Sequence, residues 1–363
     1  MSILIFILVL GALVLVHEFG HFIVAKKSGI RVDEFAIGFP PKLFSWKRGE
    51  TKYSLNLLPI GGFVKIFGEN PGEESINGPD KKRSFVHKHR LIQAAVLVAG
   101  VAMNMLFAWF LFSIAIMIGL PAPSGYAGDK PLVDGKTAIV GVYPDTPASK
   151  VGLMEGDIIL TITAPHEELR GINTEAVQTF IGNHANKELT LLVERKGKEE
   201  TFKVVPVTGF VEGRAALGVS LGQVGTLKLP FFQSIIEAGK ITYYMTGTVA
   251  IGLYDLVRTA LVGKADLTGV TGPIGIVGLV GDATKVSVTY LLGFVAMISI
   301  NLAVINLLPF PALDGGRLLF VIIEGITRRR IKPSIANALN LGGFAVLMVL
   351  MVVVTVHDIS KFF

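Results

Sequence analysis

Four apolar stretches, each long enough to cross a lipid bilayer, constrain this chain more than any other feature. They lie at 2–25, 91–119, 286–308 and 335–356. The hydrocarbon core of a bilayer is about 30 Å thick, so a spanning helix needs about 20 apolar residues, and each stretch meets that length. Of the 363 residues, 51% are hydrophobic and only 17% are charged. The sequence therefore predicts an α-helical polytopic membrane protein with four transmembrane helices in contact with lipid.

The charges between the spans predict their orientation. Residues 26–90 carry thirteen Lys or Arg against seven Asp or Glu, and a second basic loop lies around residues 317–332. Basic loops tend to remain in the cytoplasm, so both loops are expected there and the segment 120–229 outside. This asymmetry accounts for the net charge of +6, and no nucleic-acid partner is expected.

The first span contains three ionisable residues, His17, Glu18 and His21. A charge near the bilayer centre costs about 2.5–3.5 kcal/mol on insertion scales, so such residues indicate function. In a helix, positions i and i+4 share one face, and this HExxH spacing presents two imidazoles to one metal with a carboxylate beside them. At 1.5 Å per residue, His17 lies about 24 Å along the span, near its cytoplasmic end. A solvated helix face is the alternative, and the apolar surroundings weigh against it.

A third metal ligand is expected near the end of the third span. That span runs into 306–316, where Pro309 and Pro311 predict irregular backbone carrying Asn306 and Asp314. Irregular backbone at membrane depth is tolerated only where it lines protein or a water-filled cavity. Because a catalytic zinc usually keeps three protein ligands and a water, Asp314 is the candidate third ligand. A simple helix or turn cap is the alternative role for this carboxylate.

Residues 52–57 and 58–66 of the first basic loop have strand-like patterns. Gly61 and Gly62 favour a turn into the second strand, so we expect a membrane-associated β-hairpin. Such a hairpin offers an edge that holds a substrate extended, with the two glycines as contacts. A plain surface hairpin is the alternative.

Gly100 and Asn104 lie four residues apart in the second span and therefore share a face. The small residue permits close helix approach, and the amide can form a hydrogen bond across it. Helix packing alone is the alternative explanation of the pair.

The segment 120–229 has the composition of a soluble β-rich domain. Its Pro-Ala, Gly-Leu and Gly-Asp pairs at 147–148, 152–153 and 156–157 are spaced as in PDZ domains, which it resembles. PDZ domains bind a peptide C-terminus or an extended strand at a sheet edge. A steric cap over the membrane core is the alternative. The segment 230–285 is expected to lie along the membrane surface as an amphipathic element.

Together the HExxH motif, Gly100 with Asn104, the PDZ-like insert and the NxxPxxxLDG motif at 306–315 resemble bacterial site-2 proteases of the RseP type. The resemblance implies a zinc metalloprotease of the bacterial cytoplasmic (inner) membrane. Such enzymes cut transmembrane segments of single-span substrates, anti-sigma factors or remnant signal peptides, in regulated intramembrane proteolysis. It implies zinc bound by His17, His21 and Asp314, Glu18 as catalytic base, and substrate contacts at Asn306, Asn104, Gly61 and Gly62. The chain has one PDZ-like unit where enteric RseP has two in tandem.

Other classes of protein fit the sequence less well. The chain has no cysteine, which removes thiol catalysis. An aspartyl intramembrane protease needs a Gly-x-Gly-Asp motif, but position 279 is Leu, and a rhomboid needs Gly-x-Ser-Gly, but position 122 is Ala. A transporter would carry further intramembrane ionisable residues along a path. A non-catalytic membrane PDZ scaffold retaining a metal site stays open, and it would tolerate Glu18→Gln.

Overall fold

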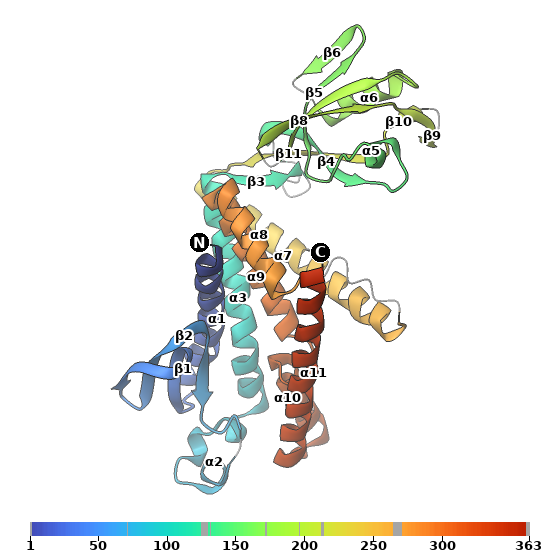
Figure 1. Ribbon diagram of the computed structural model, residues 1–363. Helices are drawn as coiled ribbons and strands as arrows, with labels where there is room; N and C mark the ends of the chain where they lie inside the picture. Colours follow the sequence, from blue (N-terminus) through green and yellow to red (C-terminus); the bar gives the residue numbers. More distant parts are fainter. Residues whose placement is uncertain are drawn as a thin grey trace. The chain divides into compact units, whose positions relative to one another are not determined.

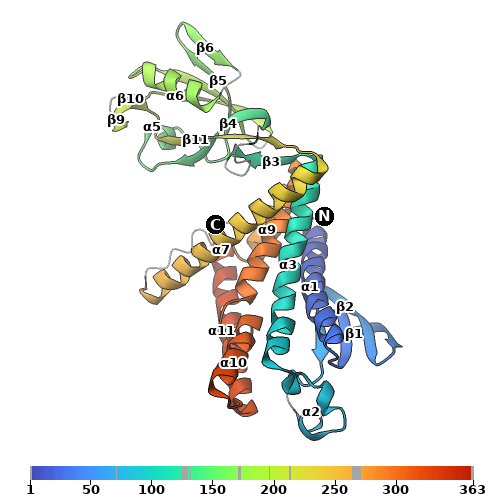
Figure 2. The same ribbon diagram turned by 180° about the vertical axis from the view of Figure 1, so that it is seen from behind.

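The computed structural model of the chain describes residues 2–70, 72–124, 130, 132–170, 173–195, 197–211, 214–263 and 271–360. These residues form two compact units (Figures 1 and 2). The first, the helical unit, comprises Met1–Ala115 and Phe231–Phe363, and the second, the β unit, comprises Ile116–Pro230. Each unit is described separately.

Within the described ranges, four helices are long and apolar enough to cross a membrane, as the sequence predicts: α1 (Ser2–Lys27), α3 (Arg90–Ile118), α9 (Val288–Asn306) and α11 (Pro333–Ser360). Both ribbon views show α1 beside α3 and α10 (Asp314–Thr327) beside α11. A β-hairpin follows α1, and three short elements then lead to α3, namely α2 (Glu73–Asn77), η1 (Lys81–Arg83) and η2 (Phe85–His87). The expected polytopic α-helical architecture is therefore confirmed.

The segment predicted to be one amphipathic element contains two helices, α7 (Phe231–Leu261) and α8 (Pro273–Val286). Pro273 stands at the start of α8, where its missing N–H costs nothing. The carboxylate of Asp358 accepts hydrogen bonds from the backbone N–H groups of Gly272 (3.1 Å) and Gly275 (2.8 Å). Asp358 therefore caps the start of α8 from near the C-terminal end of α11. Because the two segments are far apart in the sequence, no local pattern predicts this contact.

The hairpin pairs β1 (Val32–Arg48) with β2 (Thr51–Ile66) in antiparallel fashion. The tight turn between β1 and β2 lies at Gly49 and Glu50, so the prediction that Gly61 and Gly62 form the hairpin turn is wrong. The predicted change of direction near these glycines is present within β2, because Leu55 and Gly62 both pair with Ile37 of β1. Gly61 has a φ of +126°, which bends β2. As a result, Phe35 in β1 pairs with both Val64 and Tyr53 of β2.

A buried apolar cluster lies where α1, the hairpin, α3 and α10 meet. Its members are Ala25, Ile30, Val32, Ile66, Phe85, Val96, Leu97 and Val321. Burying such side chains stabilises a fold by about 1.5–3 kcal/mol each. The cluster fixes the four elements that carry the candidate site.

The β unit is built on a seven-stranded sheet in the order β3-β11-β4-β5-β7-β8, with β6 paired to β5. The strands are β3 (Leu120–Pro123), β4 (Val133–Val142), β5 (Ile158–Ala164), β6 (Glu167–Arg170), β7 (Leu189–Arg195), β8 (Lys198–Val204) and β11 (Val219–Leu227). A separate pair, β9 (Val207–Val211) and β10 (Arg214–Ala216), and the helices α5 (Pro147–Lys150) and α6 (Thr174–Asn183) complete the unit. Alternate residues of β7, Leu189, Leu191 and Val193, are buried in its core.

Candidate active site

The HExxH residues lie on α1, as the sequence predicts. His17 and His21 are one turn apart and both are buried, at 7% exposure each. Their Nε2 atoms are 3.2 Å apart. Since the helix fixes both Cα positions, the two imidazoles converge without rearrangement of the backbone.

Asp314 is the first residue of α10 and follows a tight connection, residues 307–313, from the end of α9. Gly315 and Gly316 fold directly against the backbone of that connection, where a Cβ atom would collide with carbonyl oxygens of Leu308 and Phe310. Ala312 has a φ of +78°, which is unusual for a residue with a side chain. The expectation of irregular backbone at Asn306 and Asp314 is wrong in detail, because each residue ends or begins a helix and only the residues between them are irregular.

The carboxylate of Asp314 meets both imidazoles. Its Oδ2 atom lies 2.9 Å from His17 Nε2 and 3.2 Å from His21 Nε2. One ligand atom from each of the three residues falls within 4.8 Å of the others. Two nitrogens and one carboxylate oxygen are ligands that zinc prefers, and three protein ligands leave a coordination position open. The donor set therefore fits a catalytic divalent metal.

Helix α3 lies directly behind the two imidazoles. A Cβ atom on Gly100 would stand 2.8 Å from His17 Nε2 and would collide with His21, and one on Gly20 would collide with the backbone of Ala99. The two glycines therefore allow α1 and α3 to approach closely. Asn104, one turn beyond Gly100, is completely buried with its amide against His17.

Glu18 points toward the hairpin. Its Oε2 atom accepts a hydrogen bond from the backbone N–H of Val64 in β2, at 3.0 Å. Gly61 and Gly62, which were expected to contact substrate, are buried. Gly62 packs on the carbonyl oxygen of Ala36 in β1, where a Cβ would approach to 2.7 Å. Asn306 is half-buried at the end of α9.

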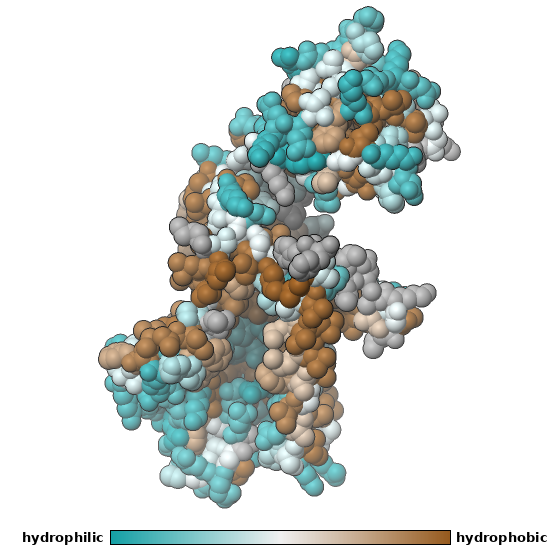
Figure 3. Space-filling view, viewed as in Figure 1, coloured by the Kyte–Doolittle hydropathy of each residue, from teal (hydrophilic) through white to brown (hydrophobic). Residues whose placement is uncertain are grey.

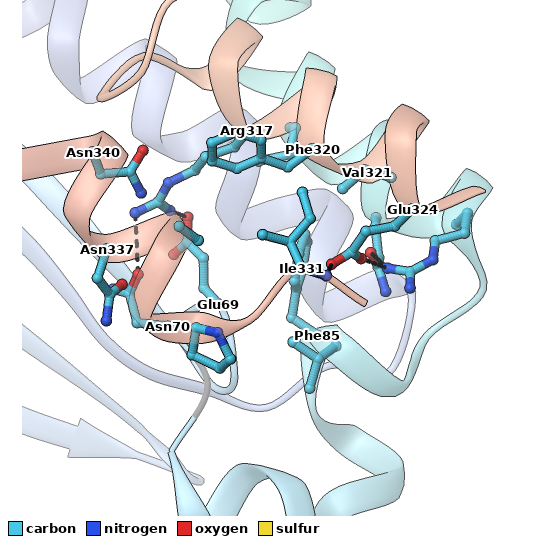
Figure 4. Close-up of a pocket in the computed structure, with 16 residues that line it drawn as sticks. Glu69, Asn70, Phe85, Arg317, Phe320, Val321, Glu324, Ile331, Asn337 and Asn340 are labelled. Carbon is cyan, nitrogen blue, oxygen red and sulfur yellow. Dashed lines mark hydrogen bonds and ion pairs between the residues drawn. The ribbon is translucent and has the colours of Figure 1, made fainter. Parts of the chain in front are cut away.

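A further pair near the site was not predicted. Arg317, one turn after Asp314 on α10, forms an ion pair with Glu69, which follows the end of β2. Figure 4 shows Arg317 reaching toward Glu69 and Asn70 at one side of a cavity of about 100 Å³. Burial raises the pKa of the Glu69 carboxyl, although the guanidinium of Arg317 acts in the opposite direction. The spacing from Asp314 places Arg317 on the same helix face, but nothing in the sequence around Glu69 indicates its partner.

Comparison with known proteins identifies the family. The sequence profile of Peptidase family M50 matches residues 5–350. This chain belongs to that family. A relative from Clostridium perfringens, provisionally named a zinc metalloprotease, is 37% identical over 99% of this chain and 98% of its own length. Zinc metalloprotease RasP of Geobacillus kaustophilus is 33% identical over the whole of this chain and 98% of its own.

These matches confirm the predicted relationship to bacterial site-2 proteases and the predicted enzyme class, a metalloprotease. The four apolar helices and the inserted β unit confirm the coarse fold class as well. The M50 match extends across the helical unit, including both histidines and Asp314.

Proposed function

We propose that this M50 member is an intramembrane zinc metalloprotease in which His17, His21 and Asp314 hold zinc and Glu18 is the general base. One observation carries the proposal: ligand atoms from α1 and α10, 297 positions apart in sequence, converge beside a carboxylate within apolar helices. Zinc is also the metal in the names of the relatives.

The surroundings of the ligands suit zinc. The Nε2 atoms of both histidines face Asp314, while His21 Nδ1 lies 2.8 Å from the carbonyl oxygen of Val96. Metal-binding histidines usually donate their other N–H to such a group, which fixes the ring and its tautomer. A zinc ion held there would supply a Lewis acid for the scissile carbonyl and lower the pKa of water.

In this proposal, Glu18 carries out the proton transfers of the reaction. Its position beside His17 lets the carboxylate accept a proton from the attacking water and pass it to the leaving amine. The N–H of Val64 orients this carboxylate from the hairpin side. Glu18 therefore serves as base and then acid from one place.

The hairpin supports a mode of substrate binding. Residues 62–66 of β2 pair with β1 along one edge, while the N–H of Val64 points away from β1 to Glu18. An extended peptide added along that free edge would pass the base. Because a helix hides its amides in its own hydrogen bonds, a transmembrane substrate must unwind here before it is cut. Asn306 would then contact the extended chain, and the buried Gly61 and Gly62 would contribute by allowing β2 to bend.

The hairpin also suits contact with lipid. Large apolar side chains are exposed near its tip, among them Leu43, Phe44, Trp46 and Leu57. Figure 3 shows hydrophobic surface over this hairpin and over α11. Exposed apolar surface of this size is typical of interaction with membrane or partner. We place the protein in the bacterial cytoplasmic membrane, with residues 26–90 inside and the β unit outside.

The β unit resembles a PDZ domain in motif spacing, and we assign it peptide binding. Strand β11 pairs with β4 from Val219 onward but with β3 only from Val224 to Leu227. In the described part of the unit, residues 219–223 therefore lack a strand partner on that side and offer an edge for a peptide. A Gly218→Val change should weaken binding of an apolar-ended peptide to the full-length protein, because Gly218 has a φ of +80°.

The substrates we propose are single-span membrane proteins, either anti-sigma factors or remnant signal peptides. The test is cleavage of a tagged single-span reporter by the purified full-length protein, with and without a chelator. Glu18→Gln should abolish cleavage, since loss of a general base costs about 10²–10⁴-fold, while zinc content stays normal. Glu175→Gln, at an exposed position of α6 in the β unit, is the matched control. Undiminished cleavage by Glu18→Gln would favour the non-catalytic scaffold instead.

A further inference from the structure

Three residues of α3 form the surface behind the two histidines. Val96, Gly100 and Asn104 are spaced by four and therefore lie on one face of the helix. The carbonyl of Val96 faces His21, Gly100 contacts both rings, and Asn104 faces His17. Since α3 runs opposite to α1 at this point, each histidine has its own partner on α3.

The partner of His17 is the amide of Asn104. The Nδ2 atom of Asn104 lies 3.4 Å from His17 Nδ1. Its Oδ1 atom is buried and has no hydrogen-bond partner among the residues that the structure describes. A buried carbonyl oxygen without a partner is costly, so its presence beside a metal-site histidine requires an explanation.

The chemistry of a metal-binding imidazole supplies that explanation. A ring whose Nε2 gives its lone pair to a metal carries its proton on Nδ1, and that N–H needs an acceptor. A half-turn of the Asn104 amide about its Cβ–Cγ bond exchanges Nδ2 and Oδ1. The oxygen without a partner would then accept the N–H of His17, as the carbonyl of Val96 accepts that of His21.

The surroundings hold Asn104 in place and away from solvent. Its side chain is fully buried, and the hydroxyl of Ser299 in α9 donates a hydrogen bond of 2.8 Å to its backbone carbonyl. A substrate in the membrane cannot reach this amide without separating the helices. The expected contact of Asn104 with substrate therefore has less support than a contact with His17.

We propose that Asn104 is a positioning residue that accepts a hydrogen bond from Nδ1–H of His17 and so fixes this ring for zinc. The inference rests on the proposed zinc site. Outer-shell partners of this kind typically change metal affinity or activity 10–100-fold. Asn104 thereby acts through His17.

Two substitutions of similar size test whether the side chain of Asn104 accepts a hydrogen bond from His17 or donates one to it. Asn104→Leu removes both groups, and Asn104→Asp keeps only acceptors. We expect Asn104→Leu to weaken zinc binding about 10–100-fold and Asn104→Asp to keep or tighten it. Zinc affinity is measured on the full-length protein in detergent by competition with a chelator, and KM and kcat are measured on the same samples. Asn301→Leu, which loses a hydrogen bond to Met297 within α9, is the matched control and should bind zinc normally.

Each other outcome is decisive. Weakened binding in Asn104→Asp would make the amide a donor and overturn the inference, even where the Leu variant fails to fold. Normal zinc affinity with a raised KM in Asn104→Leu would make Asn104 a substrate contact. If His17→Ala loses zinc while Asn104→Leu does not, the inference fails and the proposed function stands. If His17→Ala binds zinc normally, the proposed metal site itself fails.

Discussion

Two aspartates, the buried Asp157 of the β unit and the partly buried Asp314 of the helical unit, have different partners for their carboxylates. In the β unit, Asp157 is 1% exposed and receives both Nε (2.7 Å) and Nη2 (2.6 Å) of Arg195, with a third hydrogen bond from the N–H of Met154. In the helical unit, the carboxylate of Asp314 lies 2.9 Å and 3.2 Å from two imidazoles.

The difference in partners indicates a structural role for Asp157 and a metal-binding role for Asp314. A buried ion pair is satisfied when the protein itself supplies a cation in good geometry, as Arg195 does for Asp157. Neutral imidazoles that bind through Nε2 bring lone pairs and no charge, so the carboxylate of Asp314 calls for a cation from outside the chain. In the proposed site Asp314 is therefore a metal ligand, whereas Asp157 is paired with a cation of the chain itself.

The largest loss of stability should follow from breaking the ion pair between Asp157 and Arg195. Asp157→Asn leaves the guanidinium of Arg195 without its charged partner, and removing one member of a buried pair costs about 3–5 kcal/mol. Hydrogen exchange on the full-length protein should show faster exchange in β5 and β7, with zinc affinity unchanged. Glu200→Gln, at the exposed partner of Arg195, should change exchange far less. Equal protection in Asp157→Asn and wild type would refute a structural role.

Asp314→Asn is expected to lower zinc affinity while leaving the stability of the fold nearly unchanged. Structural zinc sites bind with about 10–16 kcal/mol, so one of about four ligands corresponds to about 2.5–4 kcal/mol, or about a 10²–10³-fold loss of affinity. The fold should persist, because the carboxylate meets two imidazoles that can stay neutral without it. Chelator competition and thermal unfolding measure the two effects, with exposed Asp255→Asn as control. A marked drop in the unfolding temperature of the metal-free variant would contradict this comparison.

Glu69 with Arg317 is an intermediate case, a carboxylate with a protein cation close to the metal site. Arg317→Gln should destabilise the contact between α10 and the end of β2 by about 1.5–3 kcal/mol, since hydrogen bonds to charged groups contribute about that much. The pair is partly exposed, with side chains 30% and 19% accessible, so the lower part of the range is expected. Hydrogen exchange around residues 66–70 provides the measurement. The double variant with Glu69→Gln should recover much of the loss, and no recovery would argue against a direct pair.

The smallest effect belongs to Glu50 in the hairpin turn. Hydrogen bonds from Lys26 and then Arg83 hold the pKa of Glu50 below its ordinary value of 4.5. A carboxyl with a lowered pKa in the folded state stabilises the fold above its unfolded pKa, and this contribution is lost as the pH falls through the folded pKa. Glu50→Gln should therefore cost up to about 1 kcal/mol near pH 7. Unfolding titrations of both proteins should converge below pH 4.5, and a constant difference down to low pH would be inconsistent with this pair.

The parts of the structure that sequence predicted well depend on local patterns. Apolar length predicted the four spans, and the spacing of His17 and His21 predicted a shared face. The proline and glycine residues around Asp314 predicted a tight connection after α9. In each case the physical signal lies within a few turns of the residues concerned.

The missed features depend on contacts between distant segments. The partner of β2 was missed because β1 contains Gly38, Pro40 and Pro41, which disguise a strand. The turn was then assigned to Gly61 and Gly62. The pair of Glu69 with Arg317 joins residues 248 positions apart, and periodicity carries no information at that separation.

The sequence by itself determined which segments enter the membrane, which residues could bind a metal and which carboxylate stands beside them, because helix geometry and the cost of intramembrane charge act locally. Only the tertiary structure decided that Asp314 meets both histidines, that Val64 binds Glu18 and that Asn104 lies behind His17. Those contacts depend on how closely α1, α3, α10 and the hairpin pack. Gly20 and Gly100 allow α1 and α3 to approach closely, and the apolar cluster joins residues that are far apart in the sequence.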